Sequence, residues 1–221
     1  MKSCAKVLLF ITAAGAASSL HATEISRYQL NVATEMWWGK SKVDKQRYDT
    51  SHSPVLMFSF EHGHDYLPQL GFRYSQVDTK ASSFDKYDYT LYYRLLDRDT
   101  MKFNAGVMLS QYRASRYQAP DLQEYAFNDL TFNWFGYAEL AIPNTGLDII
   151  GQIDFGENSD IKSADMTAGL QYRMNDFSYP IAVKFGYRVI DLEFSGLASS
   201  SQVGKSLVFI DGWFIGAEMS F

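Results

Sequence analysis

The end of the chain restricts its fold most, because its residues alternate strictly between two kinds. Counting back from Phe221, every second position is apolar or aromatic: Met219, Ala217, Ile215 and Trp213. The positions between them are mostly small or acidic: Ser220, Glu218, Gly216 and Phe214. Side chains of a strand point alternately to its two faces, so this segment predicts a strand with lipid on one side and a polar interior on the other.

The same alternation recurs along the chain from residue 27 onwards. It is clearest in Phe84–Leu96, where Tyr87, Tyr89 and Leu91 oppose charged and hydroxyl side chains, and weakest in Val55–His62, which is apolar on both faces. The alternating segments are Arg27–Trp38, Val55–His62, Leu67–Val77, Phe84–Leu96, Met101–Tyr112, Asn128–Ile142, Leu147–Phe155, Ala164–Met174, Tyr179–Phe194 and Ser206–Phe221. They predict an all-β fold, a single antiparallel up-and-down transmembrane barrel of ten strands, with eight strands as the alternative.

The lengths of the predicted connections also alternate. The connections after every second segment are short: His62–Asp65, Asp97–Thr100, Pro143–Gly146 and Asn175–Ser178. The others are longer, at Gly39–Pro54, Ala114–Phe127 and Ser195–Lys205, or modest, at Asp78–Ser83 and Gly156–Lys162. Outer-membrane barrels have short periplasmic turns and longer extracellular loops, so this phase favours ten strands and a periplasmic N-terminus.

A soluble up-and-down barrel of the lipocalin type is the alternative fold. Such a barrel has apolar residues inside and polar residues outside, and alternation alone does not distinguish the two arrangements. The terminal Phe221 and the many charged residues on the second face favour the membrane form.

The start of the chain predicts a secretory signal peptide over Met1–Ala22. Lys2 and Lys6 precede an apolar stretch, Val7–Ala17, that is too short to span a bilayer, and Leu20–Ala22 resembles a cleavage site. A buried N-terminal helix is the alternative. The barrel domain is then expected over residues 23–221. The single cysteine lies before the apolar stretch, so neither a lipid anchor nor a disulfide is expected.

Composition agrees with a membrane barrel. Without Lys2 and Lys6, 18 of the 20 basic residues remain against 25 acidic ones, a formal charge of −7, which argues against nucleic-acid binding. The aromatic share of 16% suits membrane interfaces, where tyrosine and tryptophan are enriched. No segment after residue 22 has the apolar length of a spanning helix, and a membrane protein without such helices must close into a barrel.

Several stretches resemble a family of small, functionally uncharacterised Gram-negative outer-membrane β-barrel proteins. These stretches are Phe58–His62, Leu67–Tyr74, Tyr87–Tyr93, Tyr137–Gly146, Gly186–Arg188 and Gly216–Phe221. The terminal Phe221 resembles the C-terminal sorting signature of bacterial outer-membrane barrels. The resemblance implies the fold and an outer-membrane location, and it brings no catalytic residues. The family pattern leads us to expect proline after the Glu-His pair, but this chain has Gly63 there. The difference bears on the shape of that turn and not on the fold.

The face predicted to point inward carries nearly balanced charges. The members of this lumen charge network are Glu35, Arg73, Arg94, Glu139, Asp154, Asp165, Arg173, Lys184, Arg188 and Glu218. Charges in a narrow barrel are expected to pair, because an isolated buried charge is costly. Pairing would fill the lumen and favours an envelope structural or surface-interaction role. The alternative is a narrow channel for ions or small solutes, whose conductance would change when Arg94 or Glu139 is neutralised.

The sequence offers weak candidates for catalysis or metal binding. His52 lies near Asp49 and Ser51, and an outer-membrane lipid-modifying enzyme would predict that His52→Ala abolishes a change in lipid A. His62 and His64 form a predicted turn that could bind a metal, although two histidines need further ligands and a solvated turn is favoured. We therefore expect no catalytic residue, no metal and no cofactor.

The predicted loops and the outer surface indicate partners only in general terms. Gly39–Pro54 and Ala114–Phe127 are either solvated caps or surfaces for partners. The expected partners are outer-membrane lipid, lipopolysaccharide and, during insertion, the barrel-assembly machinery. Asp211 faces lipid by its position in the alternation and is predicted to lie at the outer interface.

Overall fold

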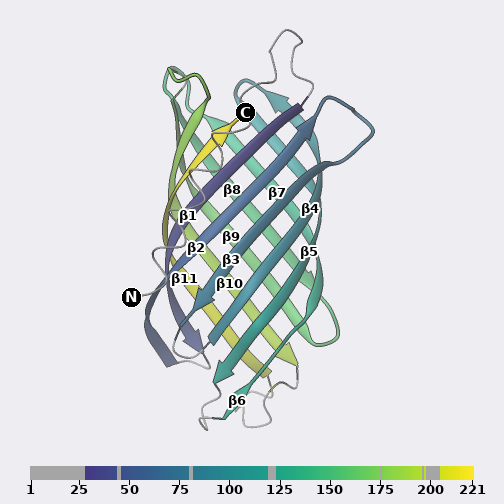
Figure 1. Cartoon of the computed structure of the whole chain (residues 1–221), viewed down its shortest axis with the longest axis vertical. Coiled ribbons are helices and arrows are strands. Elements are labelled where there is room, and N and C mark those ends of the chain that lie inside the picture. The colour runs from purple at the N-terminus through teal and green to yellow at the C-terminus, as the bar shows by residue number, and fades with distance from the viewer. Residues whose placement is uncertain are drawn as a thin grey trace.

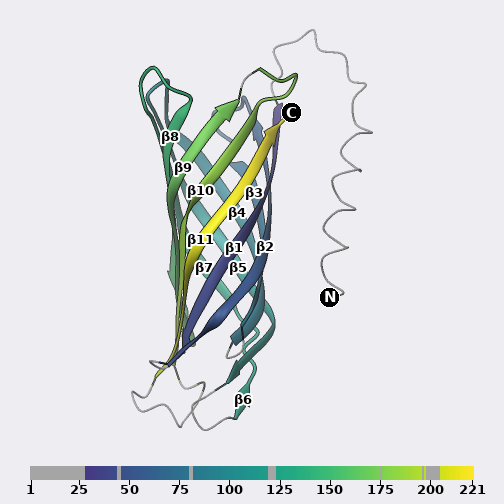
Figure 2. The same cartoon turned by 90° about the vertical axis from the view of Figure 1, so that its left-hand side faces the viewer.

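The computed structural model describes residues 28–221 apart from 44–45, 80–81, 119–122, 175, 196 and 198–204. The predicted signal peptide therefore lies outside the described residues. Within them, no helix is long and apolar enough to cross a membrane. The strands wind obliquely around a common axis and enclose a lumen (Figures 1 and 2).

Ten long strands and one short one make the wall. They are β1 (Tyr28–Val43), β2 (Gln46–His62), β3 (Gln69–Asp78), β4 (Ser82–Arg98), β5 (Met101–Gln118), β6 (Glu124–Tyr125), β7 (Leu130–Ala141), β8 (Leu147–Glu157), β9 (Ile161–Met174), β10 (Ile181–Ser195) and β11 (Lys205–Ser220). Each long strand pairs antiparallel with the next, β5 with β7, and β11 returns to β1. The short β6 pairs only with the end of β5. The predicted closed barrel of ten strands is confirmed.

The two ends of the chain's sheet form the closing seam. β1 and β11 pair continuously from Asn31 opposite Ser220 to Val43 opposite Val208. Beyond the last pair, the amide of Phe221 donates to the carbonyl of Leu30 at 2.9 Å. Because each of the ten long strands pairs with two neighbours, the long strands leave no open edge in hydrocarbon. We call the end where β1 begins and β11 ends the turn end, and the opposite end, which carries β6, the loop end (Figure 1).

Two predicted loops are wrong, because strands occupy much of their length. β1 continues to Val43 and β2 begins at Gln46, so the predicted loop Gly39–Pro54 is mostly a strand hairpin. The predicted loop Ala114–Phe127 likewise contains the end of β5 and the short β6. Strand pairing continues past the point where outward side chains stop being apolar, and hydropathy alone therefore underestimates strand length.

The outer face of the barrel carries a belt of exposed apolar side chains. On β7 and β11, Trp134 and Trp213 are 58% and 55% exposed, and their inward neighbours Asn133 and Phe214 are buried. A soluble protein rarely exposes a continuous apolar surface of this kind, so the belt is the lipid-facing surface. The belt contradicts the lipocalin-type alternative over the middle of the wall.

Asp211 points outward, as predicted from the alternation. It does not stand alone, because the hydroxyl of Tyr187 on the neighbouring β10 donates a hydrogen bond to its carboxylate. The ring of Tyr187 also packs edge-on against Trp213 at 5.1 Å between centroids. An aromatic and a carboxylate combined in this way suit a membrane interface.

Candidate functional site: a lumen in three layers

The inward face of β10 passes through three different environments. Lys184 borders an open cavity near the turn end, Arg188 lies in a buried group of charges, and Leu192 and Phe194 lie in an apolar cluster at the loop end. Strand alternation places all four side chains on one face. We call these layers the vestibule, the ion layer and the plug.

The ion layer consists of buried charged side chains from both sides of the lumen. Its members are Arg73 on β3, Lys86 and Asp88 on β4, Asp154 on β8, Asp165 on β9 and Arg188 on β10. The positive and negative charges are equal in number, and all of these residues are buried. The layer therefore joins strands that lie far apart around the barrel wall.

Arg73 is the link across the lumen. Its Nε donates to Asp88 at 2.7 Å, and its Nη2 donates to Asp165 at 3.0 Å and to Asp154. The guanidinium thus contacts carboxylates from three other strands. Charge-assisted bonds of this kind are the strong hydrogen bonds of a protein interior.

Asp165 binds the other two cations of the ion layer, Arg188 and Lys86. Arg188 binds it through Nε at 2.9 Å and Nη2 at 2.7 Å, and Lys86 donates to it at 2.9 Å. The Arg188 guanidinium also lies 5.2 Å from the ring centroid of Trp37, a cation–π distance. Because Trp37 belongs to the plug, this contact couples the ion layer to the apolar layer.

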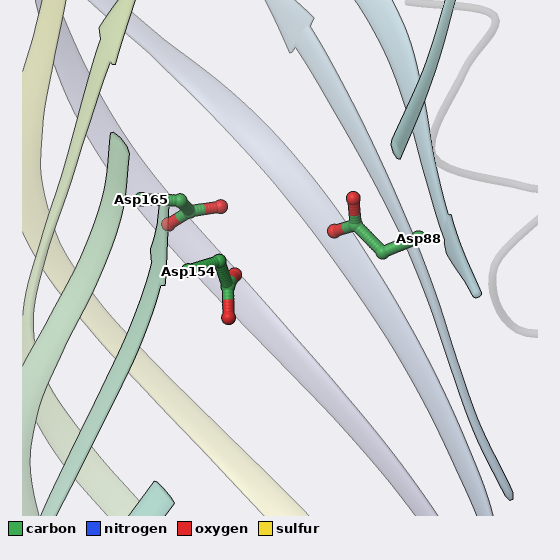
Figure 3. A group of neighbouring side chains, drawn as sticks. All are labelled: Asp88, Asp154 and Asp165. Atoms are coloured by element: carbon green, nitrogen blue, oxygen red, sulfur yellow. The ribbon is translucent and has the colours of Figure 1, made fainter. Parts of the chain in front are cut away.

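The three aspartates of the ion layer have ligand atoms within 4.8 Å of one another. Figure 3 shows Asp154 and Asp165 together on one side, with Asp88 approaching from the other. The guanidinium of Arg73 lies between them, and Lys86 bridges Asp88 and Asp165. Three fixed cations already balance the three carboxylates, so a divalent ion would have to displace them. The chemistry of this group fits an ion-pair network and does not fit a metal site.

The plug is an apolar cluster of inward side chains at the loop end. Its members are Trp37, Val77, Phe84, Tyr112, Tyr117, Phe127, Ile161, Ile190, Leu192, Phe194, Val208, Ile210 and Phe214. Each is nearly inaccessible to water. Aromatic rings pack closely in it, with 4.5 Å between the centroids of Phe127 and Phe194. This packing closes the lumen at the loop end.

Phe127 contributes to the plug although it does not belong to a strand of the barrel wall. It lies in the segment between β6 and β7, and its amide donates to Ser115 Oγ at 2.6 Å. Its buried ring contacts Phe84 and Phe194, so the last residue of the predicted loop Ala114–Phe127 points inward. Asp129 lies in the same segment. Its partial burial and the negative charge of Asp160 raise the pKa of its carboxyl.

The vestibule is a cavity of about 690 Å³ at the turn end. The side chains that shape it are those of Asn31, Tyr92, Phe135, Tyr137, Gln152, Gln171 and the charged residues described below. Tyr92 and Phe135 pack with 5.7 Å between centroids. The lumen is therefore filled at the ion layer and the plug, and it is open at the vestibule.

Most charges around the vestibule occur in pairs. Lys184 binds Glu218 at 2.7 Å, and Arg173 binds Asp148 at 2.7 Å. Lys102 binds Glu139 at 3.2 Å. These partners come from neighbouring strands, whereas in the ion layer Arg73 and Lys86 also bind carboxylates across the lumen.

Two residues of the predicted charge network lack close ionic partners. Arg94 lies 3.9 Å from both Glu61 and Asp97, and its closer contact is to the carbonyl of His62 at 3.1 Å. Glu35 lines a small recess of about 40 Å³ that shares several lining residues with the vestibule. In the described part of the chain, no hydrogen bond or ion pair engages its carboxylate.

The structure thus divides the ten predicted lumen charges between two layers. The ion layer receives Arg73, Asp154, Asp165 and Arg188; the vestibule and its recess receive Glu35, Arg94, Glu139, Arg173, Lys184 and Glu218. Sequence reasoning left Lys86, Asp88 and Asp148 out of the network. Their inward position in the alternation was the signal that could have included them.

The predicted histidine candidates occupy structural positions. His52 is exposed on the outer face of β2, where its ring packs edge-on against Trp38. His62 is buried, whereas Gly63, His64 and Asp65 are exposed, so the predicted turn is solvated apart from His62. The amide of His64 donates to His62 Nδ1, and His62 Nε2 donates to the carbonyl of Pro68. Both ring nitrogens of His62 are therefore engaged in bracing the turn, and neither is available to a metal.

Comparison with known proteins gives similarity of architecture. No protein-family model matches the chain, and no curated protein sequence matches it. The β-domain of the Bordetella autotransporter BrkA covers 89% of this chain and 99% of its own, with 10% identity and a TM-score of 0.48. Neisserial surface protein A covers 89% and 98%, with 10% identity and a TM-score of 0.41. The Escherichia coli outer-membrane protease OmpT covers 92% and 99%, with 8% identity and a TM-score of 0.42.

The closed wall and the apolar belt identify the class of protein. A sheet that closes on itself, exposes apolar side chains outward and buries charged ones inward is built for a bilayer. The protein is an outer-membrane β-barrel. Its location is the bacterial outer membrane, where single-chain barrels of this type occur.

Proposed function

We propose that the protein is a non-enzymatic, non-conducting barrel with an envelope structural or surface-interaction role. The observation that carries the proposal is the double closure of the lumen by the ion layer and the plug. Arg73 and Arg188 span the first closure, and Phe127 and Phe194 pack in the second. Ions crossing the lumen would have to separate buried ion pairs and then enter an apolar cluster, and both steps are costly.

The surroundings of the candidate catalytic groups support a role without catalysis. His52 lies against Trp38 on the outer face, and the ring nitrogens of His62 are engaged. A nucleophile–base pair needs a histidine nitrogen free to accept a proton next to a hydroxyl or thiol. If the lipid-modifying alternative were correct, His52→Ala would remove a modification of lipid A in cells that carry the protein.

Planar-bilayer recording tests the closed lumen. The mature chain, residues 23–221, is refolded, checked by heat-modifiability on a gel, and inserted into a bilayer. We expect no steady current steps from the folded protein.

A variant that keeps Trp37 and replaces Trp38, Trp134 and Trp213 by Phe gives a second measurement. Iodide added to either side of vesicles should leave the fluorescence of Trp37 unquenched.

The narrow channel is the second candidate, and the open vestibule favours it. Steady, reproducible current steps from the folded wild type would contradict the closed lumen and support the channel. In that case Asp154→Asn, in the ion layer, should change ion selectivity more than Arg94→Gln or Glu139→Gln in the vestibule. The narrowest part of the path would control selectivity, and the ion layer is that part.

A further inference from the structure

Two strands of the wall extend beyond one of their neighbours at the loop end. β5 continues to Gln118, but its pairing with β7 ends at Gln111. β2 begins at Gln46, but its pairing with β3 is limited to Val55–Phe60, and β3 ends at Asp78. On the side where a neighbour is missing, an overhang of this kind presents main-chain N–H and C=O groups that can pair with another strand.

The chain itself covers the overhang of β5. The short strand β6 pairs antiparallel with the end of β5, with Tyr125 opposite Tyr117 (Figure 1). Between this pair and the wall, the amide of Tyr112 donates a hydrogen bond to the carbonyl of Asp129 at 2.8 Å. A segment that does not belong to the wall therefore supplies the missing neighbour, and part of it does so as an extended strand.

The main chain of β2 faces β3 at every second residue. Residues of an antiparallel pair alternate between those that exchange both hydrogen bonds with the partner and those that face away from it. Leu30 and Phe221 exchange both bonds across the seam, so the odd-numbered residues of β1 face β2. The even-numbered residues of β2 then face β3. The amide and carbonyl of His62 agree with this phase, because both bond the side chain of Gln69.

Pro54 ends the pairing between β2 and β3. It is next to Leu56 in the series of residues that face β3, and it has no N–H to donate. Proline within a sheet is confined largely to edges of this kind. The series continues with His52 and, beyond a bulge in the pairing with β1, with Arg47. Within the described residues, β2 pairs only with β1 over Gln46–Pro54, so no strand lies opposite the main chain of His52 and Arg47 on this side.

The open edge begins at the outer boundary of the membrane. His52 pairs with Trp38 of β1, and Trp38 pairs with Trp213 of β11. Asp211, two residues further toward the loop end, carries the charge that marks the interface on the outer face. An unpaired edge is not tolerated in hydrocarbon, so the edge from His52 to Gln46 belongs outside it. A partner outside the membrane can therefore reach this edge.

We propose that the overhang of β2 binds an extended segment of another protein, which pairs with it as β6 pairs with β5. This inference names the partner class for the surface-interaction role proposed above and rests on that role. Main-chain hydrogen bonds supply the affinity in such strand addition, and side chains supply the specificity. A second copy fits the edge less well. Two upright copies related by an axis along the membrane normal would bring their β2 strands together in parallel, whereas the strands of this wall pair antiparallel.

Amide hydrogen exchange of the refolded chain in detergent micelles, read by NMR, tests the edge. Without a partner, the amide of His52 should exchange freely, whereas the amide of Ser53, which faces β1, should be protected. The probe is a capped peptide of alternating threonine and valine with a lysine at each end, since these residues favour strands. At about nine times its dissociation constant, the probe should slow exchange of the His52 amide about tenfold and leave that of Ser53 unchanged.

Removal of main-chain donors separates strand pairing from contacts between side chains. The same peptide with N-methylated amides keeps its side chains and should give no protection. His52→Pro removes the donor at the edge, leaves the bonds to β1 in place, and should weaken the probe about tenfold, as read from the shift of the Arg47 amide. His52→Ala is the matched control, because it removes the imidazole and keeps the amide, and it should bind the probe as the wild type does.

Three results would overturn the proposal. The first is no protection of His52 at tens of millimolar probe, and the second is equal protection by the N-methylated peptide. The third is protection of His52 before any probe is added; if that protection increases with protein concentration, a second copy covers the edge. If His52→Pro does not fold, the two peptides on the wild type still decide. Conductance does not involve this edge, so current steps would contradict the closed lumen alone, and a silent barrel without edge protection would contradict this inference alone.

Discussion

The two ends of this barrel use the same strands in opposite ways. In the middle of β10, the outward residues are apolar and Arg188 is inward, whereas near the loop end Leu192 and Phe194 are inward and Asp191 and Glu193 are outward. The middle is therefore built like a membrane barrel, and the loop end like a soluble barrel with an apolar core. The alternation continues without interruption while its polarity reverses.

This reversal shows where the bilayer ends. Apolar side chains point outward where lipid surrounds the wall, and inward where water does. On β3 and β4, Val77 and Phe84 are inward while Asp78 and Asp85 face outward, and they repeat the reversal seen on β10. The loop end therefore extends beyond the membrane, and its plug is an ordinary hydrophobic core. At the turn end the lumen is instead an open, polar cavity.

The largest effect is expected where the comparison is sharpest, at the boundary between ion layer and plug. Arg188→Gln removes two bonds to Asp165 and the contact with Trp37, and leaves a buried carboxylate short of a cation. Breaking such a pair costs about 3–5 kcal/mol, and the lost cation–π contact adds to that. Urea unfolding in phospholipid vesicles, followed by tryptophan fluorescence, measures it. A loss below about 1 kcal/mol would mean that water reaches the ion layer.

The sequence predicted the faces of the strands, and it predicted only in part what fills the lumen. Alternation depends on local geometry alone, so the inward positions of Arg73, Asp154 and Asp165 followed directly from it. Which of these residues meet depends on how the barrel closes, because Arg73 and Asp154 lie on opposite walls and are brought together only by the complete set of strands. Pairing across the lumen is a property of closure and stagger, and a single strand does not encode it.

The plug was predicted only in part. The alternation placed Phe135, Tyr137 and Phe214 inward, which indicated a plugged interior, but the inward apolar run at Ile190, Leu192 and Phe194 was not recognised. A reversal of polarity within one strand was the available signal. Phe127 could not be found in this way, because it reaches the plug from a connecting segment.

A smaller effect is expected in the difference between two Phe→Ala substitutions, one in the plug and one in the belt. Phe194→Ala leaves a cavity in a packed core and should cost about 3–5 kcal/mol. Phe185→Ala, on the same strand but in the belt, should cost about 1.5–3 kcal/mol, because lipid fills the vacated space and only the transfer contribution is lost. Both are measured by urea unfolding in the same vesicles. Equal costs would indicate that lipid or water can also fill the plug, and would contradict its role as a closed core.

The smallest effect is expected at the rim of the vestibule, with the substitution used in the ion layer. Arg94→Gln removes a cation whose carboxylate partners lie at 3.9 Å and whose side chain is 37% exposed. Exposed pairs contribute about 0–1 kcal/mol, so the unfolding free energy should change by less than about 1 kcal/mol. The small loss of unfolding free energy in Arg94→Gln should decrease further between about 0.05 and 0.5 M salt, because salt screens exposed charges. Buried pairs are screened much less. The same salt series on Arg188→Gln should leave its larger loss nearly constant. If both variants lost stability equally and with the same salt dependence, the vestibule and the ion layer would share one environment, and the division of the lumen into a wet and a dry part would be wrong.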